Sequence, residues 1–532
     1  MGIRTTVESA LSAAGQNGAE RHVGRWVGHR LGVAALTALA AVAYSVFALF
    51  LYHSFKTSSY DLVIFDQAVR SYAHFKPGIS IIKGVHNGFG PDFSVLGDHW
   101  SPILASLAPL YWIYNSPVTL LVAQAVLFAL AIPPIWAFTR RAFGGGGKAT
   151  AAAYLASVAY ALSWPIASAL AFDFHEVAFA PVLIAVALER LQAGRLRSAL
   201  IALGLLLLVK EDMGLLVAGI GLYLAVARPA TVSRQRLVAF LLIAAGLADT
   251  VVATYVLIPA FGGRSGYYWA YTALGPDVPQ AAWHLITHPG SLDLLVTPRV
   301  KLYTLLWLFG AFCFLPLRSP IALAVIPLLL ERMLANQFPD WWVTAYQYNA
   351  YLVVILVCAA VDGAARLERA WRVRRLRSAG GPAGSGVVVG LSCAAAMCAV
   401  AVALVPHFAF GGALRPSFYH RDGEASAAAA ADAVVPSGVS VQAVDNLGPQ
   451  LSARDTVLLW DGDGSTPALG SPWVVVNVGH RQFTFRSLRE QRMRVALLER
   501  SGYRVVFVRD GYVVLHRVGP QTKAAGGKEA KG

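Results

Sequence analysis

Charged residues are scarce in this sequence, and the common nucleotide-binding and catalytic motifs are absent. Only 14% of the 532 residues are charged, whereas 56% are hydrophobic, and the mean hydropathy is +0.55. So apolar a composition excludes a soluble globular protein, and we expect lipid to be the main solvent of the chain. The sequence contains no Walker loop, dinucleotide fingerprint, paired zinc-ligand motif or nucleophile elbow. We therefore expect no reaction driven by ATP bound to this chain.

Cysteine is also scarce, and basic surface patches are missing. All four cysteines lie inside apolar runs, where they form neither a disulfide nor a metal cluster in water, so we expect them to pack between helices. The formal net charge is +15, but the basic residues lie in short loops rather than on a surface with interleaved aromatic residues. This pattern excludes a nucleic-acid partner and indicates membrane topology instead.

Long apolar runs predict about eleven transmembrane helices, because crossing the hydrocarbon core takes roughly 20 apolar residues. The predicted spans are 31–52, 116–138, 149–171, 176–190, 198–210, 212–227, 237–260, 301–317, 319–334, 343–361 and 387–406. Three consecutive spans, from 176 to 227, are too short to cross a bilayer straight. They indicate either a thinned region beside a polar cavity or misplaced helix ends.

The basic residues divide the loops between the two membrane faces. They concentrate before the first span and in alternate loops, which the positive-inside rule places in the cytoplasm. The intervening loops are richer in Asp, His, Tyr and Trp. We predict a multi-pass plasma-membrane protein with a cytoplasmic N-terminal segment at 1–30 and a transmembrane domain at 31–406, whose first external loop spans 53–115. Abundant Ala, Gly and Arg with little Lys are typical of high-GC bacteria such as actinobacteria.

A change of composition after the last span predicts a small extracytoplasmic α/β domain at 407–517. Short apolar runs indicate strands, and an alanine-rich and an arginine-rich segment indicate helices. The expected strands are 439–444, 456–460, 473–478, 504–508 and 512–516, and the expected helices are 424–433 and 488–500. The tail at 518–532 is polar and rich in Gly and Lys, so we expect it to be disordered.

The first external loop carries two aspartates on a segment whose apolar spacing predicts a helix at the membrane surface. Asp61 falls in the first turn of this helix, where a carboxylate also serves as a cap for free backbone amides. Asp66 lies deeper and pairs with Arg70 at a spacing of four residues in the structural interpretation. In the functional interpretation, either carboxylate is a general base or a metal ligand.

Further polar residues lie at the ends of other predicted spans. Asp98 and His99 precede a short apolar stretch, where they bind a divalent cation or a phosphate, the alternative being an ordinary loop histidine whose hydrogen bonds are satisfied. His175 and Glu176 follow the third span, and Lys210 with Glu211 separates the fifth from the sixth. Ionisable groups at membrane depth are costly and usually functional. Lys210 is the best candidate for an anionic headgroup, the alternatives being pairing with Glu176 or Glu211 and snorkelling to the interface.

The end of the ninth span and the loop after it add a basic and an aromatic group. Arg332 either clamps a diphosphate or pairs with its neighbour Glu331. The aromatic stretch that contains Gln347 and Tyr348 is either an interfacial belt or the lining of a sugar site.

Several of these motifs together resemble a known family. They are Tyr60-Asp61-Leu62, Phe65-Asp66-Gln67, Asp98-His99-Trp100-Ser101-Pro102-Ile103, Ala108-Pro109-Leu110-Tyr111 and Lys210-Glu211-Asp212. The pattern is similar to a bacterial and archaeal family of polytopic membrane proteins of unknown function, DUF2079. That family in turn resembles the GT-C membrane glycosyltransferases in layout.

The resemblance implies transfer of a sugar from a polyprenyl-phosphate donor to an envelope glycan, lipid or protein at the outer face. Asp66 or Asp61 is then the base, Lys210 and Arg332 hold the lipid phosphate, and Asp98 with His99 positions the donor or a divalent cation. The acidic Asp-Glu pair of several GT-C enzymes is replaced here by Asp66-Gln67. The alternative function is a transporter or flippase of a lipid-linked or amphiphilic substrate; such proteins carry internal repeats, which this sequence lacks.

Overall fold

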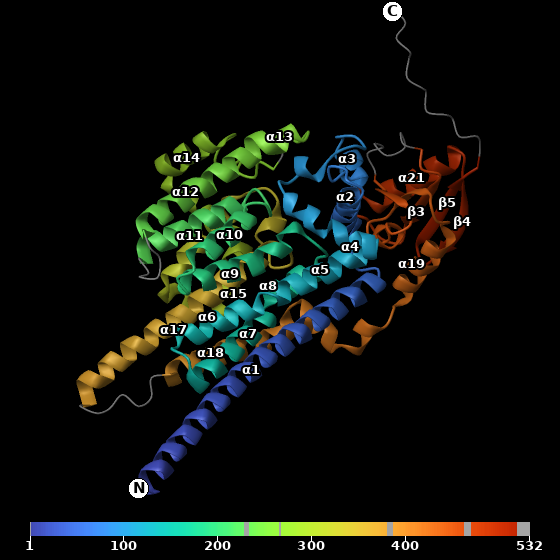
Figure 1. The fold of residues 1–532 in the computed structure, drawn as a ribbon. Helices are drawn as coiled ribbons and strands as arrows, with labels where there is room; N and C mark the ends of the chain where they lie inside the picture. Colours follow the sequence, from blue (N-terminus) through green and yellow to red (C-terminus); the bar gives the residue numbers. More distant parts are fainter. Residues whose placement is uncertain are drawn as a thin grey trace, which may run out of the picture.

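A computed structural model describes residues 2–227, 234–264, 266, 268–379, 387–461 and 470–518. Most of the described chain is helical, and a small sheet lies near the C-terminus. The helices form an elongated bundle, and the sheet lies at one end of it (Figure 1). The predicted disordered tail, apart from Val518, falls outside the described residues.

Six helical segments of the described chain are long and apolar enough to cross a membrane. They are Gly28–His53, Pro117–Ala142, Gly146–Ala171, Gln235–Ala260, Gln347–Arg375 and Val388–His407. Each coincides with a predicted span. The other five predicted spans correspond to shorter helices, so the count of eleven is not confirmed. These shorter helices are α9 (Ala180–Gln192), α10 (Leu196–Leu206), α11 (Met213–Ala227), α15 (Arg299–Gly310) and α16 (Ile326–Leu334).

The long helices differ in how much of their surface the protein itself covers. Helix α17 (Ala350–Ala379) forms the centre of the bundle, and every residue from Ala350 to Val361 is buried. By contrast, α1 (Gly2–His53), α12 (Gln235–Val252) and α18 (Val387–Leu404) lie at the periphery and expose large apolar side chains such as Leu39 and Phe240. An apolar surface of this extent requires lipid rather than water around it.

Small residues bring α11 and α12 into close contact. A Cβ atom at Gly214 would lie 2.3 Å from the carbonyl oxygen of Gly246, and one at Gly246 would lie 2.3 Å from that of Gly214. Only glycine at both positions allows this approach, which is typical of helices packed in membranes. The contact fixes α12 beside the loop that precedes α11.

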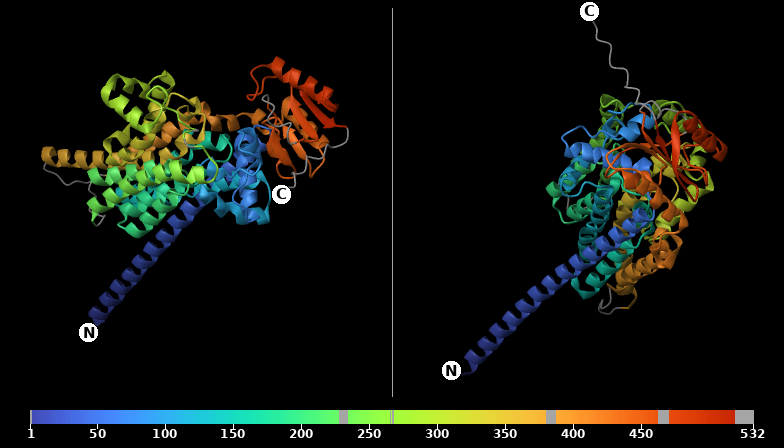
Figure 2. Two further views of the ribbon diagram at one scale, coloured as in Figure 1. Left: turned by 90° about the horizontal axis from the view of Figure 1, so that it is seen from above. Right: turned by 90° about the vertical axis from the view of Figure 1, so that its right-hand side faces the viewer.

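The segment between the first and second long helices folds into short helices at the sheet end of the bundle. They are η1 (Ser59–Val63), α2 (Ile64–Ala73), α3 (Ile81–His86), η2 (Val95–Gly97), η3 (Pro102–Leu107) and α4 (Ala108–Ile113). In Figures 1 and 2 this blue segment lies between the helix bundle and the orange and red C-terminal unit. It therefore connects the two parts of the molecule.

The C-terminal unit is a five-stranded mixed sheet with strand order β2-β1-β3-β5-β4. The strands are β1 (Ser440–Ala443), β2 (Thr456–Leu459), β3 (Trp473–Asn477), β4 (Tyr503–Arg509) and β5 (Tyr512–Arg517), each within one residue of its predicted bounds. Strand β1 pairs in parallel with β2 and β3, whereas β5 is antiparallel to β3 and β4. The helices of the C-terminal unit are α19 (Gly423–Val434), α20 (Gly448–Leu451) and α21 (Leu488–Arg500).

Candidate functional site

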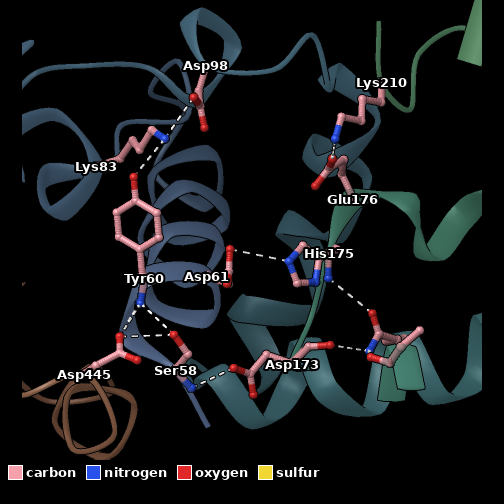
Figure 3. Close-up of polar contacts among 12 residues, drawn as sticks. Ser58, Tyr60, Asp61, Lys83, Asp98, Asp173, His175, Glu176, Lys210 and Asp445 are labelled. Carbon is pink, nitrogen blue, oxygen red and sulfur yellow. Dashed lines mark hydrogen bonds and ion pairs between the residues drawn. The ribbon is translucent and has the colours of Figure 1, made fainter. Parts of the chain in front are cut away.

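A cavity of about 510 Å³ opens where the loops at the sheet end of the bundle meet. Ten of the eleven predicted site residues line it, although they come from segments far apart in the sequence. These ten are Asp61, Asp98, His99, His175, Glu176, Lys210, Glu211, Arg332, Gln347 and Tyr348. The eleventh, Asp66, lies elsewhere. Figure 3 shows how part of this group is arranged.

The Asp61 side chain faces the cavity because other groups cap the helix that carries it. The backbone amide of Tyr60 donates to the Ser58 hydroxyl at 3.2 Å and to Asp445 Oδ1 at 3.0 Å. Asp445 belongs to the C-terminal unit, and its backbone carbonyl also accepts the Ser59 amide at 2.7 Å. Asp61 is therefore not the cap that one interpretation of the sequence assigned to it.

Burial raises the pKa of the capping Asp445 carboxyl to about 6, although hydrogen bonds from Tyr60 and Ser58 oppose the shift. This carboxyl comes from the loop after β1, some 385 residues further along the chain than Tyr60. The C-terminal unit thus fixes the segment that presents Asp61.

His175 is the nearest titratable partner of Asp61. Its Nε2 atom lies 3.4 Å from Asp61 Oδ1, and its ring is 4% exposed. Neither ring nitrogen makes a hydrogen bond within the described residues, so the contact with Asp61 is one of proximity. The backbone amide of His175 donates to Gln124 Oε1 at 3.2 Å, and Asp173, two residues earlier, accepts the Ser58 amide at 2.6 Å. These contacts hold Asp61 and His175 face to face (Figure 3).

A buried lysine that the sequence analysis missed lies on one side of this pair. Lys83 Nζ is 3.0 Å from Asp98 Oδ1 and donates to the hydroxyls of Tyr60 and Tyr268 at 3.4 and 3.2 Å. The Tyr268 hydroxyl also donates to Asp98 at 2.6 Å. Burial by itself would raise the pKa of Asp98, but the Lys83 ammonium holds it below its usual range. The only signal in the sequence was a lysine inside an apolar stretch.

The His99 side chain is paired with Glu211. Its Nδ1 atom lies 2.7 Å from Glu211 Oε1, and its ring stacks on Tyr268. Burial lowers the pKa of His99, but the Glu211 carboxylate outweighs this effect and raises it overall. Among the described residues, no group of three His, Cys, Asp or Glu side chains is arranged to hold a metal ion. Asp98 and His99 thus lack the further ligands that a cation site would need.

On the far side of the Asp61 and His175 pair, Lys210 Nζ lies 3.4 Å from Glu176 Oε1 and over the ring of Tyr348. This geometry matches the pairing alternative, and it still leaves the ammonium at the cavity wall. Lys83 and Lys210 therefore bring two buried cations to opposite sides of Asp61 in the view of Figure 3.

Arg332 does not have the geometry of a diphosphate clamp. Its guanidinium is 2% exposed and donates to the carbonyls of Trp341 and Tyr348 and to Asn349 Oδ1. Four of its hydrogen bonds are therefore already made within the protein. The side chain fixes the loop between α16 and α17, and it shapes the cavity wall instead of binding an anion.

Asp66 does not join the site, so its assignment as a candidate base needs correction. The side chain is fully buried, and Arg70 Nη2 lies 2.8 Å from Oδ2. Tyr111 donates to Oδ1 at 2.8 Å, and the Ser452 hydroxyl donates to Oδ2. Burial raises the pKa of Asp66, against the opposing effect of Arg70. Because its partners satisfy it and the cavity does not reach it, Asp66 ties α2 to α4 and to the C-terminal unit.

A second, mainly apolar cavity of about 660 Å³ adjoins the first. Both cavities are lined by Asp98, Glu211, Tyr268 and Glu331, so these residues form their common wall. The apolar lining comes from α11, α12, α14 (Val278–Thr287) and α16, and includes Leu215, Leu247, Val251 and Leu334. The site therefore has a polar compartment beside an apolar one.

A family model matches most of the chain. The family model described as "Predicted membrane protein (DUF2079)" matches residues 51–514. No curated protein matches the chain. The matched range includes every residue that lines the two cavities.

Proposed function

The chain belongs to the DUF2079 family of predicted membrane proteins, and from this premise we propose that it is a membrane glycosyltransferase of the GT-C type. It transfers a sugar from a polyprenyl-phosphate donor to an envelope glycan, lipid or protein acceptor at the extracytoplasmic face. The observation that carries this proposal is the polar cavity that shares a wall with an apolar one. An amphiphilic donor has the same two parts, a polar head and a long hydrocarbon chain.

The orientation rests on charge. The arginine-rich end of α17 projects from the bundle at the end opposite the sheet (Figure 1). Basic segments stay in the cytoplasm under the positive-inside rule, so the cavity and the C-terminal unit belong on the other face. Polyprenyl-phosphate sugars that have been flipped across the membrane are presented there.

In the proposed reaction Asp61 is the general base. Its carboxylate accepts the proton of the acceptor hydroxyl while the acceptor oxygen bonds to the anomeric carbon. The bond from that carbon to the phosphate oxygen breaks, and polyprenyl phosphate leaves with the electron pair. Lys83 gives up its long contact with Tyr60 and Lys210 its contact with Glu176, and the two ammonium groups stabilise the departing anion from the two sides of the cavity. His175 orients Asp61 through its Nε2 atom.

The test is transfer of radiolabelled sugar by purified protein in nanodiscs, with Asp61→Asn compared with wild type. We expect transfer to fall roughly 10²- to 10⁴-fold, the usual contribution of a positioned base. Asp92→Asn, at an exposed site that lines neither cavity, is the matched control. Undiminished transfer by Asp61→Asn would remove this mechanism. Movement of the lipid between leaflets without any transfer would favour the flippase instead.

A further inference from the structure

The polar cavity has more hydrogen-bond acceptors than the protein itself uses. Five buried oxygen atoms in its lining lack a hydrogen-bond partner among the described residues: Glu176 Oε2, Asp212 Oδ1, Glu331 Oε2, Gln347 Oε1 and the Tyr351 hydroxyl. Gln347 and Tyr351 are 6% and 1% exposed, so bulk water does not satisfy them. An ionised carboxylate and an amide oxygen accept hydrogen bonds only, whereas a phenol hydroxyl both donates and accepts. A ligand that supplies hydrogen-bond donors can therefore satisfy all five oxygen atoms.

The charges of the lining indicate which kind of hydrogen-bond donor a ligand should carry. Seven carboxylates line the cavity, against three residues with a fixed positive charge. The carboxylates are Asp61, Asp98, Glu176, Glu211, Asp212, Glu331 and Asp340, and the cations are Lys83, Lys210 and Arg332. The phosphate group of the proposed substrate adds further negative charge. Buried charges need partners, so the excess must be neutralised by protons or by the ligand itself.

Each cation of the lining already has an acidic or carbonyl partner. Lys83 is held by Asp98, Lys210 by Glu176, and Arg332 by backbone carbonyls. Among the remaining carboxylates, His99 pairs with Glu211. No ion pair is found for Asp212 or Glu331 among the described residues. These two acids influence each other electrostatically, and Glu331 belongs to the wall shared with the apolar cavity.

We infer that the lipid-linked sugar carries a free, protonated amino group, whose ammonium binds between Asp212 and Glu331. This inference rests on the proposed function and specifies the class of its donor. In the lipid, the sugar is bonded directly to the phosphate at the end of the hydrocarbon chain. The sugar should therefore lie near the common wall of the two cavities. Gln347 and Tyr351 then accept hydrogen bonds from its hydroxyl groups. An ammonium has three donors and no acceptor, which matches the unpaired oxygen atoms.

The experiment measures equilibrium binding of three matched lipids to wild-type protein in nanodiscs, by displacement of a fluorescent polyprenyl phosphate. The lipids carry a 2-amino-2-deoxyhexose, its N-acetyl derivative and the plain hexose on the same polyprenyl phosphate. We expect the lipid with the free amine to bind at least about tenfold more tightly than the other two, because only its ammonium group can form charged hydrogen bonds with Asp212 and Glu331. The preference falls as the pH rises through the pKa of the sugar amine.

Variants locate the effect within the cavity. Asp212→Asn and Glu331→Gln keep the side-chain volume, and each is expected to abolish the preference while binding of the plain hexose lipid persists. Asp92→Asn is expected to keep the preference. The thermal midpoint of each variant in the nanodisc shows whether it folds, and the three-lipid comparison on wild type requires no variant at all.

The possible outcomes separate this inference from the proposed function. Equal binding and transfer of all three sugars would mean that protons neutralise the cavity; the amine inference would then be wrong and the transferase would stand. If none of the three lipids bound more tightly than polyprenyl phosphate alone, both the amine inference and the proposed transferase would be wrong.

Discussion

Two aspartates five residues apart in one short segment lie in opposite environments. Asp61 is partly exposed to the cavity, and its nearest titratable neighbour, His175, is 3.4 Å away. Asp66 is fully buried, and Arg70, Tyr111 and Ser452 bond to it. The segment thus has a cavity face and an anchoring face, which contacts α4 and the C-terminal unit. A carboxylate whose bonds are all made within the protein stabilises the fold, and one with bonds left to make is available for a substrate.

The largest effect is expected from removing the anchoring acid. Asp66→Ala leaves the buried Tyr111 and Ser452 hydroxyls, and the partly exposed Arg70 guanidinium, without their acceptor, so the free energy of unfolding should fall by about 3–5 kcal/mol. Asp61→Ala should change it by less than about 1 kcal/mol, because Asp61 makes no comparable contact. Thermal unfolding of both variants in the same nanodiscs measures the difference. Equal shifts in the two variants would show that Asp66 does not anchor the fold more than Asp61 does.

A second anchoring group is Arg332, which sequence reasoning assigned to the substrate. Lysine retains the charge but lacks the planar fork that reaches Trp341, Tyr348 and Asn349 together. Arg332→Lys should therefore destabilise the protein by roughly 2–3 kcal/mol. If the protein kept its stability and lost only affinity for the lipid phosphate, Arg332 would belong to the cavity face after all.

The two faces are coupled through Asp445, which caps the helix that carries Asp61. Asp445→Ala removes hydrogen bonds to Tyr60 and Ser58 and should cost about 1–2 kcal/mol of stability. We also expect slower sugar transfer, because Asp61 is no longer held in place. Asp422→Ala is the matched control, since Asp422 caps α19 within the same C-terminal unit through the Ala425 amide at 2.8 Å. It should cost similar stability and leave transfer unchanged; a parallel loss of transfer would show that Asp445 acts only through stability.

The smallest effect concerns the pair of His99 and Glu211 at the common wall. The pKa of His99 is raised in the folded protein, so the pair stabilises the fold fully below pH 6.5 and loses this contribution as the pH rises through the raised value. Both side chains are partly exposed, which limits the contribution to about 1 kcal/mol. Thermal midpoints of wild type and His99→Gln should differ at pH 6 and converge at alkaline pH. A difference that grew with pH would contradict the assigned charge state.

Much of the architecture could be predicted from the sequence because its determinants are local. Six long apolar runs became the six long helices, and alternating apolar residues marked the strands of the C-terminal sheet to within one residue. The remaining spans could not be counted, because the short helices α9 to α11 are buried in part by protein and need not match the bilayer thickness.

The candidate site was predictable as a collection of residues but not in its pairings. Charge asymmetry between loops indicated that Asp61, Asp98 and Lys210 share one face, and all three line one cavity. The role of Asp66 depends on Ser452, which is 386 residues away, and no local pattern reports such a contact. Lys83 was missed for a related reason, since its partner Asp98 lies on a different short helix end of the same external loop and the hydroxyl of Tyr268 comes from a distant segment.

Whether one amphiphilic substrate occupies both cavities can be seen in a cryo-EM structure of the protein with a lipid-linked sugar in nanodiscs. We expect a sugar beside Asp61 and His175, a phosphate within hydrogen-bonding distance of Lys83 or Lys210, and a hydrocarbon chain along Leu247 and Val251. Density for the lipid at another surface, with both cavities filled only by water, would contradict this expectation.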